Sequence, residues 1–313
     1  MTDWKPSADI EMLQKRAALL ANIRTFFAAR DVMEVDVPVL ATTTVADPNI
    51  ESFIVSFSAD AFEKYYLMTS PEFYMKRLLA AGCQSIYYLG KAFRAEENSS
   101  RHAAEFTMLE WYRPHWNAQQ LMDEVSALVT EHISGEIQKT TYRQVFLDHL
   151  GIDPHIATAS DLKTLANEKL SPAFDSDDKN IWLDLLFSHV VEPQLQGLVF
   201  VEQFPVAQAA LAQTYADAYG NPVAARFELY INGVEIANGY QEELDAKVLA
   251  ERFLDNIALR KSRGQTLPPV DERFLAAMAA GMPACAGVAL GFDRLLMAIG
   301  DKKNIAAVLP FCN

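Results

Sequence analysis

The sequence predicts an α+β fold in which a mostly antiparallel sheet is flanked by helices. Two observations lead to this prediction. Helix-like and strand-like patterns follow one another in runs, in the order helix, strands, helices, strands and helix, and this order is typical of α+β folds. Two hairpins are also recognisable, one with a long charged loop over 96–104 and one around Asn232-Gly233.

The N-terminal half begins with a helix pattern and continues with strand patterns. Leu13, Ala17 and Leu20 recur at the three- and four-residue spacing of a helix. Pro71 suits the first turn of a second helix, with Ser70 as its cap. The expected elements, in order, are a helix over 10–30, strands over 32–39, 53–57 and 65–68, a helix over 71–81, strands over 85–95 and 105–112, and a helix over 118–134.

The C-terminal half contains a helical insertion and a well-defined hairpin. We interpret the irregular helical pattern near 142–200 as an insertion in a single domain that spans 1–313. Asn232-Gly233 is the strongest two-residue hairpin signal, and pairing across it sets Tyr230 opposite Glu235. The remaining expected elements are strands over 226–231 and 234–238, helices over 243–263 and 271–280, a strand over 287–291, and a helix over 294–299 capped by Asp293.

The composition is that of an acidic globular protein. Of the 313 residues, 50% are hydrophobic and 22% are charged, and the net charge of −14 argues against a broad cationic surface for nucleic acids. The three cysteines are far apart and form neither a disulfide framework nor a metal clip, which favours a reducing cytoplasm. The longest uncharged stretch, 276–292, is interrupted by glycine and proline, so no membrane span is expected. The sequence has neither GxxxxGK[ST] nor a strand-linked GxGxxG, so a nucleotide would bind without the two commonest phosphate loops.

Three motifs are candidates for chemistry, although each alone has a simpler explanation. Arg94 lies at a strand end, where a guanidinium can bind a phosphate, and Phe106 on the returning strand can stack on a base. Glu235 and Glu242 flank a strand end and supply the oxygen ligands that Mg²⁺ prefers. The segment 287–294, Gly-Val-Ala-Leu-Gly-Phe-Asp-Arg, offers glycines for close approach of a ligand and an arginine at a helix start. The simpler explanations are a surface ion pair, carboxylates favoured by the helix dipole, and glycines that serve packing.

Together and in this order, the motifs resemble the catalytic domain of class II aminoacyl-tRNA synthetases of the lysyl type. The segment 34–38 resembles motif 1, which builds the dimer interface in that family; 93–112 resembles motif 2, and 287–294 resembles motif 3. Segments 69–72 and 235–242 are similar to lysyl-specific segments. The resemblance covers nearly the whole chain.

A second resemblance narrows the group. Lysyl-tRNA synthetases carry an anticodon-binding barrel before this domain, whereas motif 1 begins here by residue 34, so we expect the barrel to be absent. A lysyl-type domain standing alone resembles a group of ligases that attach (R)-β-lysine to a lysine side chain of elongation factor P, and 106–114 and 287–291 particularly resemble that group. The resemblance implies ATP and Mg²⁺ as cofactors, lysine or (R)-β-lysine as substrate, elongation factor P as acceptor, a homodimer, no tRNA and no membrane.

The resemblance also assigns roles to individual residues. It implies catalytic contacts to ATP phosphates for Arg94 and Arg294, and Mg²⁺ ligands in Glu235 and Glu242. The implied ATP-binding residues are Arg94, Glu96, Ala103, Phe106, Glu235, Ile236, Gly291 and Arg294. The implied substrate-binding residues are Ser70, Pro71, Glu72, Tyr112, Asn238, Glu242 and Ala289.

Two positions differ from the commonest pattern of the lysyl-type family. Ala103 replaces an asparagine whose side chain hydrogen-bonds the nucleotide, so weaker ATP affinity is expected. Ala289 replaces a glycine, and its methyl would narrow the amino-acid pocket, which in the ligase group accompanies preference for β-lysine.

Two other functions are compatible with the sequence. One is a tRNA-charging enzyme of lysyl type without an anticodon domain. The other is a non-catalytic regulator that binds an amino acid or its adenylate; the retained arginines and glutamates speak against it, and Ala103 speaks mildly for it.

Overall fold

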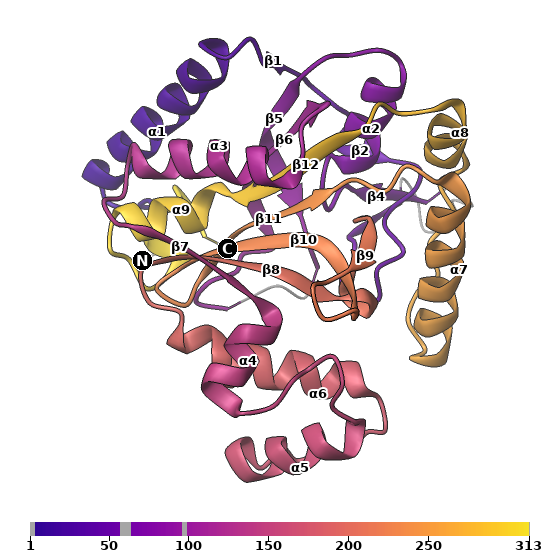
Figure 1. The fold of residues 1–313 in the computed structure, drawn as a ribbon. Coiled ribbons are helices and arrows are strands. Elements are labelled where there is room, and N and C mark those ends of the chain that lie inside the picture. The colour runs from indigo at the N-terminus through magenta and orange to yellow at the C-terminus, as the bar shows by residue number, and fades with distance from the viewer. Residues whose placement is uncertain (1–3, 57–63, 96–98, 313) are drawn as a thin grey trace. The chain divides into compact units, whose positions relative to one another are not determined.

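The computed structural model describes residues 4–56, 64–95 and 99–312 and contains two compact units. The first comprises Met1–Leu121 and Glu242–Asn313, and the second comprises Met122–Gln241. Both contain helices and mostly antiparallel strands, which confirms the α+β prediction (Figure 1). None of the helices in the described part of the chain is long and apolar enough to cross a membrane.

In the first unit, strands β1, β5, β6 and β12 are hydrogen-bonded in that order. Strands β5, β6 and β12 are antiparallel neighbours, and β1 runs parallel to β5. A smaller sheet has the order β2-β4-β3. The elements of this unit are α1 (Ile10–Ala28), β1 (Met33–Glu34), β2 (Leu40–Ala41), β3 (Ile54–Val55), β4 (Tyr65–Leu67), α2 (Glu72–Ala80), β5 (Ile86–Phe93), β6 (Glu105–Pro114), α7 (Ala246–Ser262), α8 (Glu272–Ala280), β12 (Cys285–Gly291) and α9 (Phe292–Ile299).

In the second unit, strands β11, β10, β8 and β7 are hydrogen-bonded in that order, with β9 beside β10. Helices α4, α5 and α6 gather together at the bottom of Figure 1 and surround their own apolar cluster. These helices lie in the region where the insertion is predicted. The elements are β7 (Ile137–Thr141), α4 (Tyr142–Leu150), α5 (Ala159–Leu170), α6 (Lys179–Leu186), β8 (Leu198–Pro205), β9 (Thr214–Ala216), β10 (Pro222–Ile231) and β11 (Glu235–Gln241); α3 (Ala118–Thr130) spans the boundary between the units.

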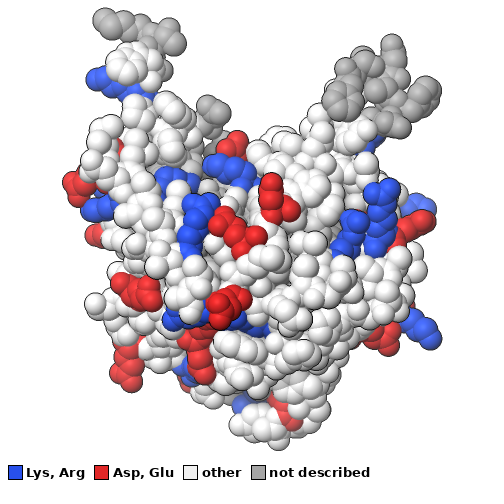
Figure 2. Space-filling view, turned by 90° about the horizontal axis from the view of Figure 1, so that it is seen from above, with Lys and Arg blue, Asp and Glu red and all other residues white. Residues whose placement is uncertain are grey.

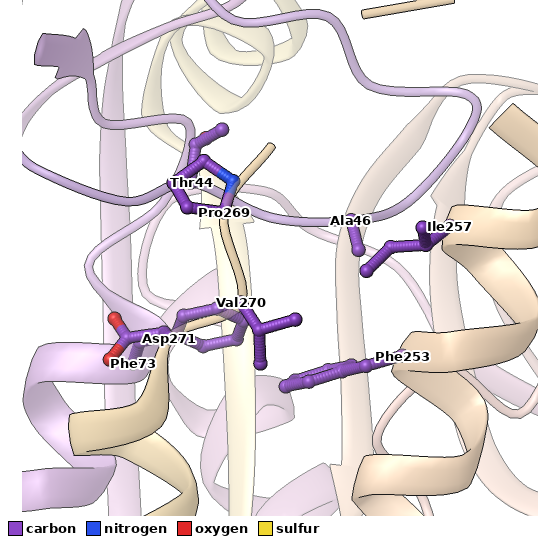
Figure 3. Close-up of a pocket in the computed structure, with 8 residues that line it drawn as sticks. All are labelled: Thr44, Ala46, Phe73, Phe253, Ile257, Pro269, Val270 and Asp271. Atoms are coloured by element: carbon purple, nitrogen blue, oxygen red, sulfur yellow. The ribbon is translucent and has the colours of Figure 1, made fainter. Parts of the chain in front are cut away.

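Three phenylalanine rings join α2, α7 and α8 in the first unit. The Phe73 ring stacks on Phe274 with centroids 4.4 Å apart, and Phe253 lies 5.6 Å from Phe73. Beside them is a shallow pocket lined by Thr44, Ala46, Phe73, Phe253, Ile257, Pro269, Val270 and Asp271 (Figure 3). Because Phe73 anchors α2 to this cluster, the orientation of the neighbouring residues on α2 is fixed as well.

The predicted strand over 32–39 is wrong in extent. The structure has only the short strands β1 and β2 there, separated by a segment that contains Pro38. Proline has no N–H to donate to a strand ladder, so it interrupts pairing.

Two predicted helix caps also need correction. Pro71, not Ser70, is the N-cap residue of α2, although the Ser70 hydroxyl accepts a hydrogen bond from the Glu72 N–H at 3.1 Å. Gly291, not Asp293, is the N-cap residue of α9. Asp293 lies in the first turn of α9, and its carboxylate accepts a hydrogen bond from the Thr107 N–H at 2.6 Å.

The hairpin at Asn232-Gly233 is confirmed. Tyr230 lies opposite Glu235, and Ile231 and Val234 exchange two backbone hydrogen bonds of 2.9 and 3.1 Å. Because Ala237 pairs with the residue before Tyr230, Ile236 is an extra, unpaired residue in a bulge. The bulge follows directly on the turn and determines which side chains of β11 share a face.

Replacing Gly233 by alanine should destabilise the fold strongly. Gly233 has φ +70°, and a Cβ there would lie 2.8 Å from the Glu192 carbonyl oxygen. Gly220 is the matched control, since it has φ +84° but a Cβ added there would meet no atom within 4 Å. We expect Gly220→Ala to cost about 1 kcal/mol and Gly233→Ala about 2 kcal/mol more, measured by urea unfolding. Equal losses in the two variants would contradict this explanation.

Candidate functional site

Alternate residues of β6 face opposite sides of the sheet and have different surroundings. On one side, the Trp111 ring packs against Phe27 of α1 at 5.3 Å between centroids. The even-numbered residues of the strand, which are Phe106, Met108, Glu110 and Tyr112, therefore share the other side. Strand β12 sets Gly291 opposite Met108, Ala289 opposite Glu110, and Gly287 opposite Tyr112. Candidate residues from motifs 2 and 3 thus lie on one face of two paired strands.

One end of this face carries two arginines. The Arg94 guanidinium lies 5.3 Å from the centroid of the Phe106 ring. The backbone N–H of Arg94 donates to the backbone carbonyl of Ala104 at 3.0 Å. Arg294 of α9 donates to the Arg101 carbonyl at 3.5 Å and to Nε2 of His102. Both arginines therefore contact the same short segment, 101–106.

The remaining predicted ATP-binding residues of the first unit lie at the same end. Ala103 is a buried residue of the 101–106 segment, and Gly291 ends β12 beside α9. Glu96 lies outside the described residues.

His102 contacts two side chains through its two ring nitrogens. Nε2 contacts the Arg294 guanidinium, and Nδ1 lies 2.8 Å from the Ser99 hydroxyl. His102 therefore connects Arg294 to the motif 2 loop.

The other end of the face carries a buried lysine between two carboxylates. The Lys76 ammonium lies 2.7 Å from Glu72 and 2.6 Å from Glu242, and it is fully buried. Burial by itself would lower the pKa of Lys76, but the carboxylates of Glu242 and Glu72 outweigh burial and raise it. Lys76 is therefore a permanent cation that holds the two glutamates together.

A third carboxyl group belongs to the same cluster. Glu110 accepts a hydrogen bond from the Tyr112 hydroxyl at 2.7 Å, and both side chains are buried. Burial, reinforced by the negative charge of Glu72, raises the pKa of Glu110 to about 8. Burial also raises the pKa of Glu242 to about 7, although Lys76 opposes this shift. A carboxyl group with a pKa of about 8 is largely protonated at neutral pH, so the Lys76 charge is balanced mainly by Glu72 and by the ionised fraction of Glu242.

Gly287 is the residue that makes room for this cluster. A Cβ at Gly287 would overlap the Tyr112 ring and the Glu242 carboxylate. The missing side chain therefore accommodates the protein's own residues, which agrees with the packing explanation of this glycine and not with close approach of a ligand.

Three predicted residues belong to the second unit. Glu235 and Ile236 begin β11, with Ile236 buried in the bulge. Asn238 lies opposite Glu228 on β10, and its Oδ1 is buried and has no hydrogen-bond partner among the described residues. An unmatched buried acceptor is costly, and a donor on a ligand would satisfy it.

Polar side chains of β10 near the hairpin are also largely buried. Glu228 accepts hydrogen bonds from Arg226 and Tyr230, and both Glu228 and Tyr230 are buried. Arg226 also donates from Nη1 to the Gln208 carbonyl at 2.7 Å, and its Nε is buried without a hydrogen-bond partner among the described residues.

Lys76 and Glu110 are not among the site residues that the sequence predicts, although signals for both existed. Lys76 follows Glu72 by four residues on a helix, so the two side chains share a face. Glu110 precedes Tyr112 by two residues on a strand and must lie on the same side.

This geometry can be compared with known proteins. The family model described as "tRNA synthetases class II (D, K and N)" matches residues 2–313. The chain belongs to this family. The class II resemblance inferred from the three motifs is thereby confirmed, and so is the expected fold class.

Curated relatives of similar length carry a more specific name. The chain is 43% identical over 316 residues to "Elongation factor P--(R)-beta-lysine ligase" of Salmonella typhi, covering 98% of this chain and 97% of the relative. Proteins of the same name from Histophilus somni (strain 2336) and Hamiltonella defensa subsp. Acyrthosiphon pisum (strain 5AT) are each 42% identical, over 314 and 317 residues. These alignments cover 98% and 99% of this chain and 97% of each relative. The relatives are thus class II synthetase-like ligases.

The buried carboxyl of Glu110 predicts how stability changes with pH. Its pKa of about 8 in the folded protein exceeds the ordinary value of 4.5, so the folded state binds the proton more tightly than the unfolded state. The stabilisation is complete below pH 4.5 and is lost as the pH rises to about 8. Relative to Glu110→Gln, the wild type should therefore lose unfolding free energy over this range, by at most about 1.4 kcal/mol per pH unit.

Urea unfolding at pH 5, 6, 7 and 8 measures this difference. Glu105→Gln is the control, because Glu105 lies on the same strand with an exposed side chain. The control curve should run parallel to the wild type. A Glu110→Gln curve that is also parallel would contradict a raised pKa at Glu110.

Proposed function

We propose that this protein is an ATP-dependent ligase that activates (R)-β-lysine, or lysine, as an adenylate and transfers it to a lysine side chain of elongation factor P. The observation that carries the proposal is the arrangement along β6, with arginines at one end of a face and a carboxylate cluster at the other. Phe106 and Tyr112 are six residues apart, a strand length of about 20 Å, which suits a nucleotide joined to an amino acid. The relatives named "Elongation factor P--(R)-beta-lysine ligase", each covered to 97% by the alignment, support the proposal.

The residues at the Arg94 end fit ATP. Two guanidinium groups on one short segment match the charge of a polyphosphate, and the Phe106 ring offers a face for adenine. Arg94 and Arg294 would bind phosphate oxygens and stabilise the charge that develops on them. Ala103 offers no side-chain hydrogen bond to the nucleotide, so we expect it to weaken ATP affinity.

The residues at the Glu110 end fit a cationic amino acid. Burial raises the pKa of Glu110 to about 8 and that of Glu242 to about 7, so an ammonium group of the substrate placed beside them would favour their ionised forms and be bound by them. The buried Oδ1 of Asn238 would accept a further hydrogen bond. The proposed substrate site also contains Tyr112, Ser70 and Pro71. Ala289 lies opposite Glu110, and its methyl would narrow the space for the amino acid there.

The proposed chemistry has two steps. A carboxylate oxygen of the amino acid attacks the α-phosphorus of ATP, a new P–O bond forms, and pyrophosphate leaves with the electrons of the broken bond. A lysine amine of the acceptor then attacks the adenylate carbonyl, forming the C–N bond as AMP leaves and the nitrogen loses a proton to water. Orientation of the two substrates and the arginine charges account for such catalysis without an acid–base residue.

Mg²⁺ is the metal ion proposed to accompany ATP. Glu242 is paired with Lys76, and across residues 4–56, 64–95 and 99–312 no group of three or more His, Cys, Asp and Glu side chains is arranged to hold a metal. Mg²⁺ usually takes most of its ligands from phosphates and water, with one or two carboxylates, so Glu235 and Glu242 remain the proposed protein ligands. When bound, the ion would neutralise part of the phosphate charge.

We also propose that the protein acts as a homodimer on a protein acceptor in the cytoplasm. Apolar side chains are exposed on edge strands of the first unit, with Met33 52% and Ile54 44% accessible, and burial in a second copy would remove them from water. Sedimentation equilibrium tests the dimer. Acidic and basic side chains are interspersed on the face in Figure 2, which shows no continuous basic surface for tRNA.

The decisive experiment is ATP–pyrophosphate exchange with α-lysine, (R)-β-lysine and (S)-β-lysine, followed by mass spectrometry of treated elongation factor P. We expect the fastest exchange with (R)-β-lysine and one β-lysyl addition to the factor. Ala289→Gly should reduce the preference for (R)-β-lysine over α-lysine by about tenfold, because one methyl is worth about 1–3 kcal/mol in such a pocket.

Three outcomes would overturn the proposal. No exchange with any isomer and an unmodified factor would reject the ligase activity. Charging of deacylated tRNA without modification of the factor would indicate the tRNA-charging alternative. Calorimetric ATP binding without exchange would indicate a regulator.

A further inference from the structure

A buried arginine in the first unit connects three elements that are far apart in the sequence. Arg16 of α1 donates from Nη1 to the Asp293 carboxylate at 2.5 Å and from Nη2 to the Thr107 hydroxyl at 2.7 Å. Asp293 in turn accepts the Thr107 N–H at 2.6 Å. Two side-chain contacts of Arg16 and the backbone N–H of Thr107 therefore close a triangle of three residues between α1, β6 and α9.

The triangle is almost inaccessible to solvent. Arg16 is 8%, Thr107 5% and Asp293 2% exposed. The guanidinium also lies 4.9 Å from the centroid of the buried Phe292 ring, and Nη1 contacts the Val308 carbonyl at 3.3 Å. Buried charges that are fully hydrogen-bonded in this way hold their neighbours in one arrangement.

Two of the three corners adjoin a residue proposed to bind ATP. Thr107 follows Phe106 on β6, and Asp293 precedes Arg294 on α9. The last residue pair between β6 and β12 joins Met108 to Gly291. Beyond that pair, the backbone N–H of Thr107 on β6 donates to the Asp293 carboxylate.

We propose that Arg16 is a positioning residue for ATP, which sets the spacing between the Phe106 ring and the Arg294 guanidinium. This inference rests on the proposed function, because that function assigns ATP to Phe106 and Arg294. Arg16 itself acts from the opposite side of the sheet, through Thr107 and Asp293. A planar guanidinium is suited to this role because it donates to both partners at once, whereas an ammonium has no such fixed fork.

The sharpest test is the pair Thr107→Val and Thr107→Ser. Valine keeps the shape of threonine and the backbone N–H but removes the hydroxyl that accepts from Arg16; serine keeps that hydroxyl. In pyrophosphate exchange we expect Thr107→Val to raise the KM for ATP by about tenfold and leave the KM for the amino acid within about twofold, while serine restores most of the ATP affinity. Arg16→Lys should behave like Thr107→Val.

Arg143→Lys is the matched control. It alters an Arg–Asp ion pair of 2.6 Å, to Asp153, in the second unit. We expect a lower melting temperature and an unchanged KM for ATP. If Thr107→Val and Arg16→Lys likewise change only the melting temperature, the triangle is merely structural and the proposal is wrong.

Calorimetric titration with ATP separates this inference from the proposed function. It needs neither an amino acid nor an acceptor, so it is informative even if the wild type gives no exchange. Weaker ATP binding in Thr107→Val than in Thr107→Ser supports the positioning role. Equal affinities, or no ATP binding by the wild type, overturn it.

Discussion

The alternation of side chains along β6 is the constraint on which the first unit depends. Odd-numbered residues face α1, where Trp111 packs on Phe27 and Thr107 hydrogen-bonds Arg16. Even-numbered residues line the opposite face, from Phe106 at one end to Tyr112 at the other. One strand therefore anchors the sheet to a helix and presents the candidate site, and shifting its register by one residue would exchange the two roles.

Buried charge is the second organising feature. Lys76 lies between two carboxylates and is fully buried, so loss of the lysine would leave both glutamates without their cation. Glu110 adds a third carboxyl group whose pKa burial has raised. A cluster of this kind is unfavourable by itself, which is the reason that we connect it with a cationic substrate. At the arginine end the charges have the opposite sign, and the two ends suit the two parts of an aminoacyl-adenylate.

Several predictions from the sequence succeeded because they depend on short-range geometry. The two-residue turn at Asn232-Gly233 specifies its own hairpin, and the pairing of Tyr230 with Glu235 follows from it. The motifs of the class II family were recognisable for a similar reason, since each is a short segment of fixed spacing. The error at the cap of α9 arose because distant residues compete for the predicted cap. Asp293 was expected to cap α9, but the Thr107 N–H and the Arg16 guanidinium compete for its carboxylate, and both come from other elements.

The sequence by itself determined the α+β class, the hairpins and the family, and most residues of the candidate site were proposed from it. These depend on periodicity, turn chemistry and motif order, all of which are local along the chain. Only the tertiary structure showed that Lys76 joins Glu72 to Glu242, that Gly287 leaves space for Tyr112, and that Arg16 reaches Asp293. The contacts of Lys76 with Glu242, of Gly287 with Tyr112 and of Arg16 with Asp293 join residues distant in sequence, and burial decides their energies. Local patterns cannot reveal them, because desolvation and partner choice are fixed only when the chain has folded.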